Sequence, residues 1–274
     1  MTRPELFQDV PAFIAEILAR RGVASTQELE LKLKYLLAPS LKGLNEAIQL
    51  MDAAIDQQHK IVIVGDYDAD GATSTALMIL ALREMGAQVE YLVPDRFKYG
   101  YGLTPAIADL AFTSFTPDLL ITVDNGISSH DGVKQAQDHG MQVIITDHHL
   151  TTKPTPSAQA VVNPNQLGCD FPSKALAGVG VAFYVLANLS TYRKKLNKSS
   201  ALMSQYLDLV ALGTYADVAS LDYNNRILVD VGLKRIQQHL CRPGISALLE
   251  IAGREAITLK AQDLGFVLGP RINA

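Results

Sequence analysis

The chain has 274 residues, of which 48% are hydrophobic and 19% are charged. This length fits one large domain or two small ones, and the apolar content suffices for a sizeable core, which excludes a disordered chain. Two cysteines, Cys169 and Cys241, exclude a disulfide scaffold and a cysteine-rich zinc module and indicate a reducing compartment. The net charge of −4 argues against a nucleic-acid binder, unless a bound cation neutralises several acids.

No targeting or membrane segment is predicted. The first ten residues carry Glu5 and Asp9 and lack an apolar stretch, so they do not form a signal peptide. The most apolar stretch, 175–189, is shorter than the about 20 residues of a membrane span and predicts a buried helix. We therefore expect a cytoplasmic protein that does not contact a membrane.

Residues 1–57 are predicted to form a helical N-terminal segment. Apolar residues recur at helical spacing in 13–18, 29–37 and 44–55. None of these stretches carries a cluster of chemically special side chains, so we expect a packing appendage or a lid.

Residues 58–240 are predicted to form an α/β domain. Short apolar runs alternate with helical stretches, a pattern typical of an open parallel sheet with helices on both faces. The predicted strands are 61–64, 89–93, 119–123, 143–146 and 160–162, and the predicted helices between them are 74–85, 105–112 and 129–139.

The later part of the chain is predicted to be helical. Helices are expected at 175–189, 204–212, 226–240 and 245–252, and the polar run 193–200 is expected to be a solvated loop. Residues 241–274 are expected to connect to a further domain, because the ending at 269–274 does not resemble a natural terminus.

Carboxylates and imidazoles follow three of the predicted strands. Ligands of open α/β sheets bind beyond the carboxyl ends of the strands, so these side chains should meet at one edge. Crowded carboxylates repel one another, and no Lys or Arg within these motifs neutralises them, so divalent cations explain the cluster. Oxygen ligands with one or two histidines suit Mg²⁺ or Mn²⁺, and a two-ion site serves phosphodiester hydrolysis. The residues are Asp66, Asp68, Asp70, Asp124, Asp147, His148, His149 and, after a later apolar helix, Asp217.

Other interpretations of these motifs are weaker. Residues 66–71 match the start of an EF-hand loop, but the required twelfth-position Glu is replaced by Leu77. The same turn could be only a helix cap. Residues 178–183 resemble a dinucleotide-binding motif, but they follow no strand and have Phe183 at the third glycine position.

The triplet Asp147-His148-His149 resembles the signature of the DHH phosphoesterase superfamily, and the other acids match its motifs in order. From about residue 40 to the end, segments such as VGDYDADGATSTAL and LGPRINA resemble the RecJ family of bacterial exonucleases. The resemblance implies two Mn²⁺ or Mg²⁺ ions and 5′-to-3′ hydrolysis of single-stranded DNA with a free 5′ end to 5′-mononucleotides. It also implies a role in DNA recombination and repair, a monomer, and a helicase and a single-strand-binding protein as candidate partners.

The resemblance also implies residue roles. It makes Asp124 the bridging metal ligand, and it makes Asp66 an additional ligand. It makes Asp147 the carboxylate that orients the imidazole pair, His149 the group that contacts the scissile phosphate, and Asp70 both a ligand and a catalytic group. The implied metal ligands are Asp66, Asp68, Asp70, Asp124, His148 and Asp217.

Three further residues are implied to bind the substrate. Arg96 resembles a 5′-phosphate anchor, Tyr101 an aromatic that stacks on a base and blocks duplex entry, and Arg271 a contact to the DNA backbone.

The sequence also departs from the family. Val64 stands where many members of the superfamily have a histidine ligand. The family's DHHA1 domain and oligonucleotide-binding barrel are not in this sequence, so we expect weak or absent processive activity. Without the six site acids the net charge would change from −4 to +2, which weakens the charge objection to a nucleic-acid substrate.

Two other functions stay open at this point. One is a DHH-type phosphatase that acts on short oligonucleotides, cyclic dinucleotides or pyrophosphate. The other is a non-catalytic metal-binding scaffold that recruits replication or repair partners.

Overall fold

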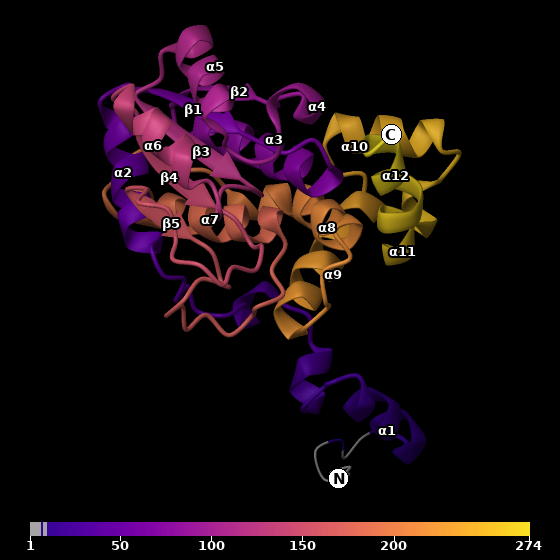
Figure 1. Ribbon diagram of the computed structural model, residues 1–274. Helices are drawn as coiled ribbons and strands as arrows, with labels where there is room; N and C mark the ends of the chain where they lie inside the picture. Colours follow the sequence, from indigo (N-terminus) through magenta and orange to yellow (C-terminus); the bar gives the residue numbers. More distant parts are fainter. Residues whose placement is uncertain (1–6, 8–9) are drawn as a thin grey trace.

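The computed structural model describes residue 7 and residues 10–274 (Figure 1). The predicted helical segment 1–57 therefore falls in part, at residues 1–6, 8 and 9, outside the described residues.

Five parallel strands form one open sheet, in the order β2-β1-β3-β4-β5. This confirms the predicted α/β class. The strands are β1 (Lys60–Val64), β2 (Gln88–Leu92), β3 (Leu119–Val123), β4 (Gln142–Thr146) and β5 (Ala160–Val162).

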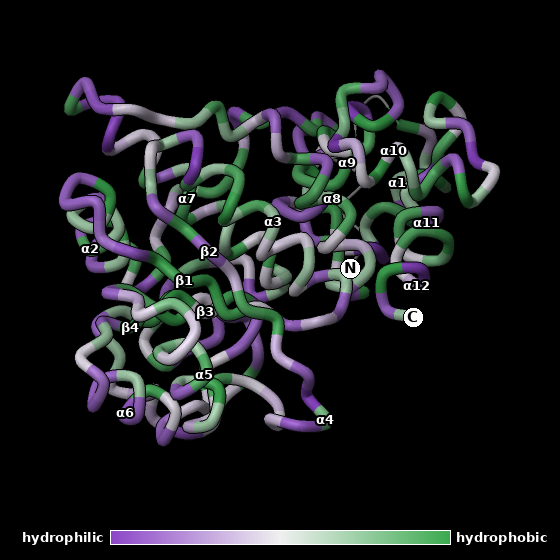
Figure 2. The backbone as a smooth tube through the Cα atoms, turned by 90° about the horizontal axis from the view of Figure 1, so that it is seen from above, coloured by the Kyte–Doolittle hydropathy of each residue, from purple (hydrophilic) through white to green (hydrophobic). Residues whose placement is uncertain are grey.

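Both faces of the sheet are covered by helices, which explains why the strand sequences are apolar without alternation. Ile61 and Ile63 of β1 pack into a core with α2 (Leu44–Asp56), α3 (Ala69–Glu84) and α7 (Gly178–Lys195). Val62 and Val64, which point to the opposite face, pack with α5 (Pro105–Phe115) and α6 (His130–Asp138). Figure 2 shows the hydrophobic strands at the centre and the hydrophilic α4 (Arg96–Tyr99) projecting from the body.

The N-terminal segment differs from its prediction. Helix α1 (Ala12–Arg20) lies apart from the sheet (Figure 1). The predicted helix at 29–37 is wrong, because two 3₁₀ turns flank an extended stretch there. Tertiary partners satisfy the backbone instead, since the Leu37 N–H donates to Asn224 and the Tyr184 hydroxyl donates to the Leu37 carbonyl. The turns are η2 (Thr26–Leu29) and η3 (Leu33–Tyr35).

The C-terminal helices share the larger core, which extends from Leu41 to Leu268. In Figure 1 the last of them gather beside α8 and α3. The expected domain boundaries near residues 58 and 240 stay a prediction. The elements are η4 (Met203–Tyr206), α8 (Leu207–Ala216), α9 (Tyr223–Gln237), α10 (Pro243–Ile251), η5 (Ala256–Thr258), α11 (Ala261–Asp263), the π-helical turn η6 (Leu264–Leu268) and α12 (Gly269–Ile272).

Within the part of the chain that the structure describes, no helix combines the length and the apolar character needed to cross a bilayer.

The predicted solvated loop at 193–200 is wrong at its start. Helix α7 continues to Lys195, and the Arg193 side chain is only 3% exposed. Its guanidinium lies 2.5 Å from Asp52 and 3.0 Å from Asp56, both on α2. A buried arginine that ties two helices together cannot be distinguished from a surface charge by composition alone.

Replacing Arg193 with Met should destabilise the protein by about 3 kcal/mol, because Asp52 loses its buried partner and keeps only the more exposed Lys198, which lies 2.7 Å away. Lys194→Ala, an exposed change on the same helical turn, should cost less than about 0.5 kcal/mol. Denaturant unfolding measures both values. Equal stabilities of the two variants would contradict a structural role for the buried pair.

Candidate metal centre

The acidic turn 66–71 joins the end of β1 to the start of α3. Helix α3 begins at Ala69, earlier than predicted, because Asp68 is its N-cap and accepts a hydrogen bond from the Gly71 N–H at 2.9 Å. The cap interpretation is therefore correct for one oxygen of Asp68, while the turn still delivers Asp66 and Asp70 to the same sheet edge.

Asp124 follows β3 with a left-handed backbone, φ +60°. That conformation is strained for a residue other than glycine and is typical of functional sites. The neighbouring Asn125 amide fixes it by donating to the carbonyls of Val64 and Val123. A Cβ atom on Gly178 would lie 2.6 Å from Asp124 Oδ1, so only glycine leaves room for this carboxylate.

The N-terminus of α7 holds Asp70. The backbone N–H groups of Gly178 and Val179 donate to its two oxygens at 2.6 and 2.8 Å. A helix N-terminus stabilises negative charge. The glycine-rich motif at 178–183 thus binds a carboxylate of the chain itself.

Asp147 builds the turn that carries the two histidines. Its Oδ1 accepts the His149 ring Nδ1–H at 2.7 Å and the N–H groups of His148 and His149, and its Oδ2 accepts the Ile127 N–H. The amides of Asn163 and Asn165 donate to the carbonyls of His149 and His148. These two asparagines support the site but were not singled out from the sequence, where only their place in a motif, V-N-P-N, marks them.

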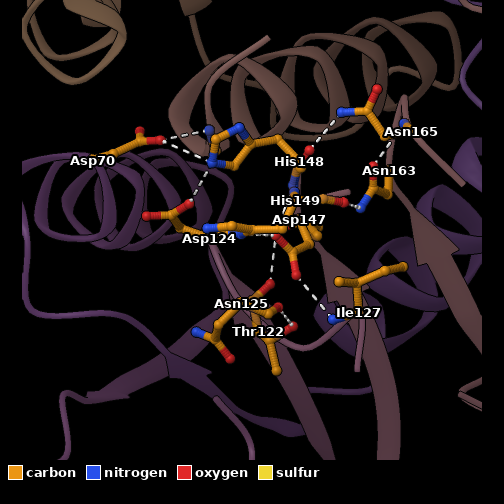
Figure 3. A network of polar contacts seen from close by, with 12 residues as sticks. Asp70, Thr122, Asp124, Asn125, Ile127, Asp147, His148, His149, Asn163 and Asn165 are labelled. Atoms are coloured by element: carbon orange, nitrogen blue, oxygen red, sulfur yellow. Dashed lines mark hydrogen bonds and ion pairs between the residues drawn. The ribbon is translucent and has the colours of Figure 1, made fainter. Parts of the chain in front are cut away.

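The structure brings the other seven predicted residues together. Ligand atoms within each of three overlapping groups lie within 4.8 Å of one another. Figure 3 shows the His148 ring directed at both Asp70 and Asp124, with distances of 3.8 and 3.1 Å. The groups are Asp66, Asp68 and Asp124; Asp124, His148 and His149; and Asp70, His148 and Asp217.

Burial makes this cluster electrostatically unfavourable on its own. Burial and then the charge of Asp68 raise the pKa of Asp66 to about 6, and burial raises the pKa of Asp70 to about 7. Burial and then Asp70 raise the pKa of Asp124, and burial raises that of Asp217. Each shift reports a carboxylate that is costly to ionise in this environment.

In His149 and Asp147, by contrast, the pKa moves in the direction that favours the charged form. The hydrogen bond to Asp147 raises the pKa of His149, which shifts the imidazole toward its protonated form. Burial alone would raise the pKa of Asp147, but its hydrogen bonds and the charge of His149 outweigh burial and lower it.

The donor set fits divalent cations. Asp124 Oδ1 is buried and receives no hydrogen bond, although His148 Nε2 lies only 3.1 Å away. Among the described residues, no Lys or Arg forms an ion pair with the clustered acids. Carboxylate oxygens with imidazole nitrogens suit Mn²⁺ or Mg²⁺, so Asp66, Asp68 and Asp124 could hold one ion and Asp70, His148 and Asp217 another.

Two open clefts flank the histidines. One of ≈ 490 Å³ lies against Tyr101, Asp147 and the start of α6. The other, of ≈ 530 Å³, lies against His148, Lys174 and Asp217. His149 lines both, so the two clefts meet at this histidine, and His148 and Asp217 line the second.

The predicted substrate residues occupy different places. The Arg96 guanidinium lies over the Tyr67 ring, and the Tyr101 hydroxyl lies 3.4 Å from His149 Nε2. Arg271 is exposed on α12 and donates to the Val267 carbonyl, with no contact to the acids.

Val64 and Asn273 add to what the sequence led us to expect. Val64, where the resemblance implied that a histidine ligand is missing, is 1% exposed and packs in the core between the sheet and α5–α6. Asn273 was missed, although its side chain accepts the Ala69 N–H at 2.7 Å and ties the last residues to α3.

The model of the DHH family, N-terminal domain, matches residues 60–214. The chain belongs to the DHH family. The single-stranded-DNA-specific exonuclease RecJ of Dickeya dadantii is 51% identical to this DHH chain over 98% of the chain and 48% of the relative. RecJ of Bacillus subtilis is 38% identical over 97% of the chain and 33% of the relative. The DHH chain thus spans about half the length, or less, of these curated relatives.

Solved structures agree. A crystal structure of exonuclease RecJ bound to manganese has a TM-score of 0.75 and 38% identity to the DHH chain, over 86% of this chain and 58% of that one. RecJ from Thermus thermophilus in complex with Mn²⁺ has a TM-score of 0.77 and 35% identity, over 94% and 36%. The resemblance drawn from the motifs is confirmed.

Replacing Asp124 with Asn should stabilise the metal-free protein at pH 8, by about 1 kcal/mol, because one charge leaves a crowded buried set. The same change should abolish most of the stabilisation that added Mn²⁺ gives the parent. Thermal unfolding in EDTA and in Mn²⁺ measures both effects, with Asp138→Asn, outside the cluster, as the control. A variant that gains as much stability from Mn²⁺ as the parent would rule out Asp124 as a ligand.

Proposed function

We propose that this chain carries the catalytic core of a metal-dependent exonuclease, which hydrolyses single-stranded DNA from a free 5′ end to 5′-mononucleotides in DNA recombination and repair. The observation that carries the proposal is the convergence of three ligand groups, each within 4.8 Å, where two open clefts meet. Similarity to proteins named as single-stranded-DNA-specific exonucleases supports it.

The cofactors would be two Mn²⁺ or Mg²⁺ ions. Asp66, Asp68 and Asp124 would hold one, and Asp70, His148 and Asp217 the other, with Asp124 near enough to His148 to bridge them. When bound, such ions supply positive charge that stabilises the phosphodiester transition state and favours ionisation of the attacking water.

The residues of the chain would divide the remaining work. His149, protonated and fixed by Asp147, would donate from Nε2 to the scissile phosphate and stabilise the negative charge that develops there. The N–H groups at the start of α7 would keep Asp70 in place, while Asp147 keeps the imidazole from rotating. Both arrangements are pre-organised by the fold, so little reorganisation is needed on reaction.

The strand would enter through the cleft beside Tyr101. Arg96 would anchor the 5′ phosphate, Tyr101 would stack on a base and exclude a duplex, and Arg271 would contact the backbone. We further propose that the protein acts as a monomer in the cytoplasm, with a helicase and a single-strand-binding protein supplying the single strand. A cleft on each side of His149 suits a polymer better than a short oligonucleotide.

The test compares a 5′-phosphorylated single strand, its duplex and a dinucleotide, each with Mn²⁺. The single strand should lose 5′-mononucleotides one at a time, and Asp124→Ala should slow this release by about 100-fold or more. Asp138→Asn, which lies outside the cluster, should match the parent.

Three results would count against the proposal. Undiminished digestion by Asp124→Ala would overturn the site assignment. Faster hydrolysis of the dinucleotide than of the strand would favour the phosphatase. Mn²⁺ binding without hydrolysis of any of these substrates, by this chain and by a full-length protein that contains it, would favour the scaffold.

A further inference from the structure

The Arg96 side chain is exposed and is not paired with an acid. Among the described residues, no carboxylate lies within ion-pair distance of its guanidinium and no acceptor receives a hydrogen bond from it, although Asp95 precedes it. Its contacts are aromatic: the guanidinium carbon lies 4.2 Å from the Tyr67 ring centroid and 5.7 Å from that of Phe97. The five N–H donors of the Arg96 guanidinium are therefore free, while its face packs on the Tyr67 ring.

The sheet topology creates this contact. Strands β1 and β2 are parallel neighbours, paired through Val64 and Leu92, and the chain leaves both at the same edge. Tyr67 comes just after β1 and Arg96 just after β2, on the projecting α4. Residues far apart in sequence thus meet beside the metal ligands.

Both partners are held by their backbones. The Tyr67 N–H donates to Asp66 Oδ1 at 2.8 Å, and the next residue, Asp68, caps α3. On the other side, Asp95 caps α4 by accepting the Phe97 N–H at 2.8 Å. Tyr67 stands between two candidate metal ligands, so the backbone that carries its ring is fixed relative to the candidate metal centre.

We propose that Tyr67 is a positioning residue, whose ring holds the Arg96 guanidinium at a fixed place and orientation for the 5′-terminal phosphate. The inference rests on the proposed function, in which Arg96 is the phosphate anchor. A guanidinium stacked on a ring keeps its N–H edge free for a bidentate contact with phosphate. Holding an otherwise mobile side chain before the ligand arrives removes part of the entropy cost of binding.

Phe97 differs from Tyr67 in a way that makes it a useful contrast. Its ring is 93% exposed and lies farther from the guanidinium, whereas Tyr67 is 38% exposed. Phe97 could stack on a base, but such a contact would not distinguish a 5′ phosphate from a 5′ hydroxyl. The preference between these two ends therefore isolates the contribution of Tyr67.

The experiment measures kcat/KM with Mn²⁺ for one strand carrying either a 5′ phosphate or a 5′ hydroxyl, and the binding of both strands in EDTA by fluorescence anisotropy. Tyr67→Leu should reduce the preference for phosphate about 2- to 5-fold, the effect expected of a partly exposed cation–π contact. Tyr67→Phe, which keeps the ring, should retain it. Phe97→Leu, and Tyr192→Leu on the distant part of α7, should leave the preference unchanged.

The Arg96→Ala variant separates this inference from the proposed function. Arg96→Ala should lose the phosphate preference, and Tyr67→Leu added to it should reduce the preference no further, because the two residues act as one unit. If Arg96→Ala loses the preference and Tyr67→Leu retains it, the positioning role is wrong while the anchor stands. If Tyr67→Leu weakens both strands equally, the ring has only a structural role. If Arg96→Ala retains the preference, the anchor itself fails and the inference fails with it.

Discussion

The burial of carboxylates that also repel one another is the constraint on which the rest of this structure depends. Asp70 and Asp124 are each 2% exposed, and Asp66, Asp68 and Asp217 lie close by. A fold gains no stability from collecting acids in this way. The fold reduces the cost only in part, by directing two N–H groups of α7 at Asp70, while Asp124 Oδ1 stays unpaired. Among the described residues, no Lys or Arg pairs with the remaining carboxylates, so bound cations would have to neutralise them.

The packing of the sheet sets the geometry of this cluster. Because helices bury both faces, strand register is fixed, and the chain leaves β1, β3 and β4 at one edge. Close backbone approaches then refine the positions: Gly178 leaves room for Asp124, and Asp147 gathers four N–H groups from its own turn and from Ile127. The packing that stabilises the core therefore also fixes the positions of the site residues. Asn273 links the end of the chain to the same site by accepting the Ala69 N–H.

The sequence predicted the features that depend on local pattern. Apolar runs located the five strands, and acids after three strands located the cluster, because parallel topology brings those ends together. The sequence-based predictions failed where contacts with residues distant in the sequence determine the local conformation. The leucines of 29–37 have helical spacing, but Asn224 and Tyr184 hold that backbone otherwise. Likewise, nothing near Arg193 in the sequence shows that it is buried in an ion pair with Asp52, and nothing in 178–183 shows that Gly178 lies against Asp70 and Asp124.

Anomalous diffraction from crystals of this protein soaked in Mn²⁺ tests the central claim most directly. Our account predicts two manganese peaks at the sheet edge, one bounded by Asp66, Asp68 and Asp124 and the other by Asp70, His148 and Asp217. The absence of any peak among these side chains, at a concentration that raises the melting temperature, would contradict it.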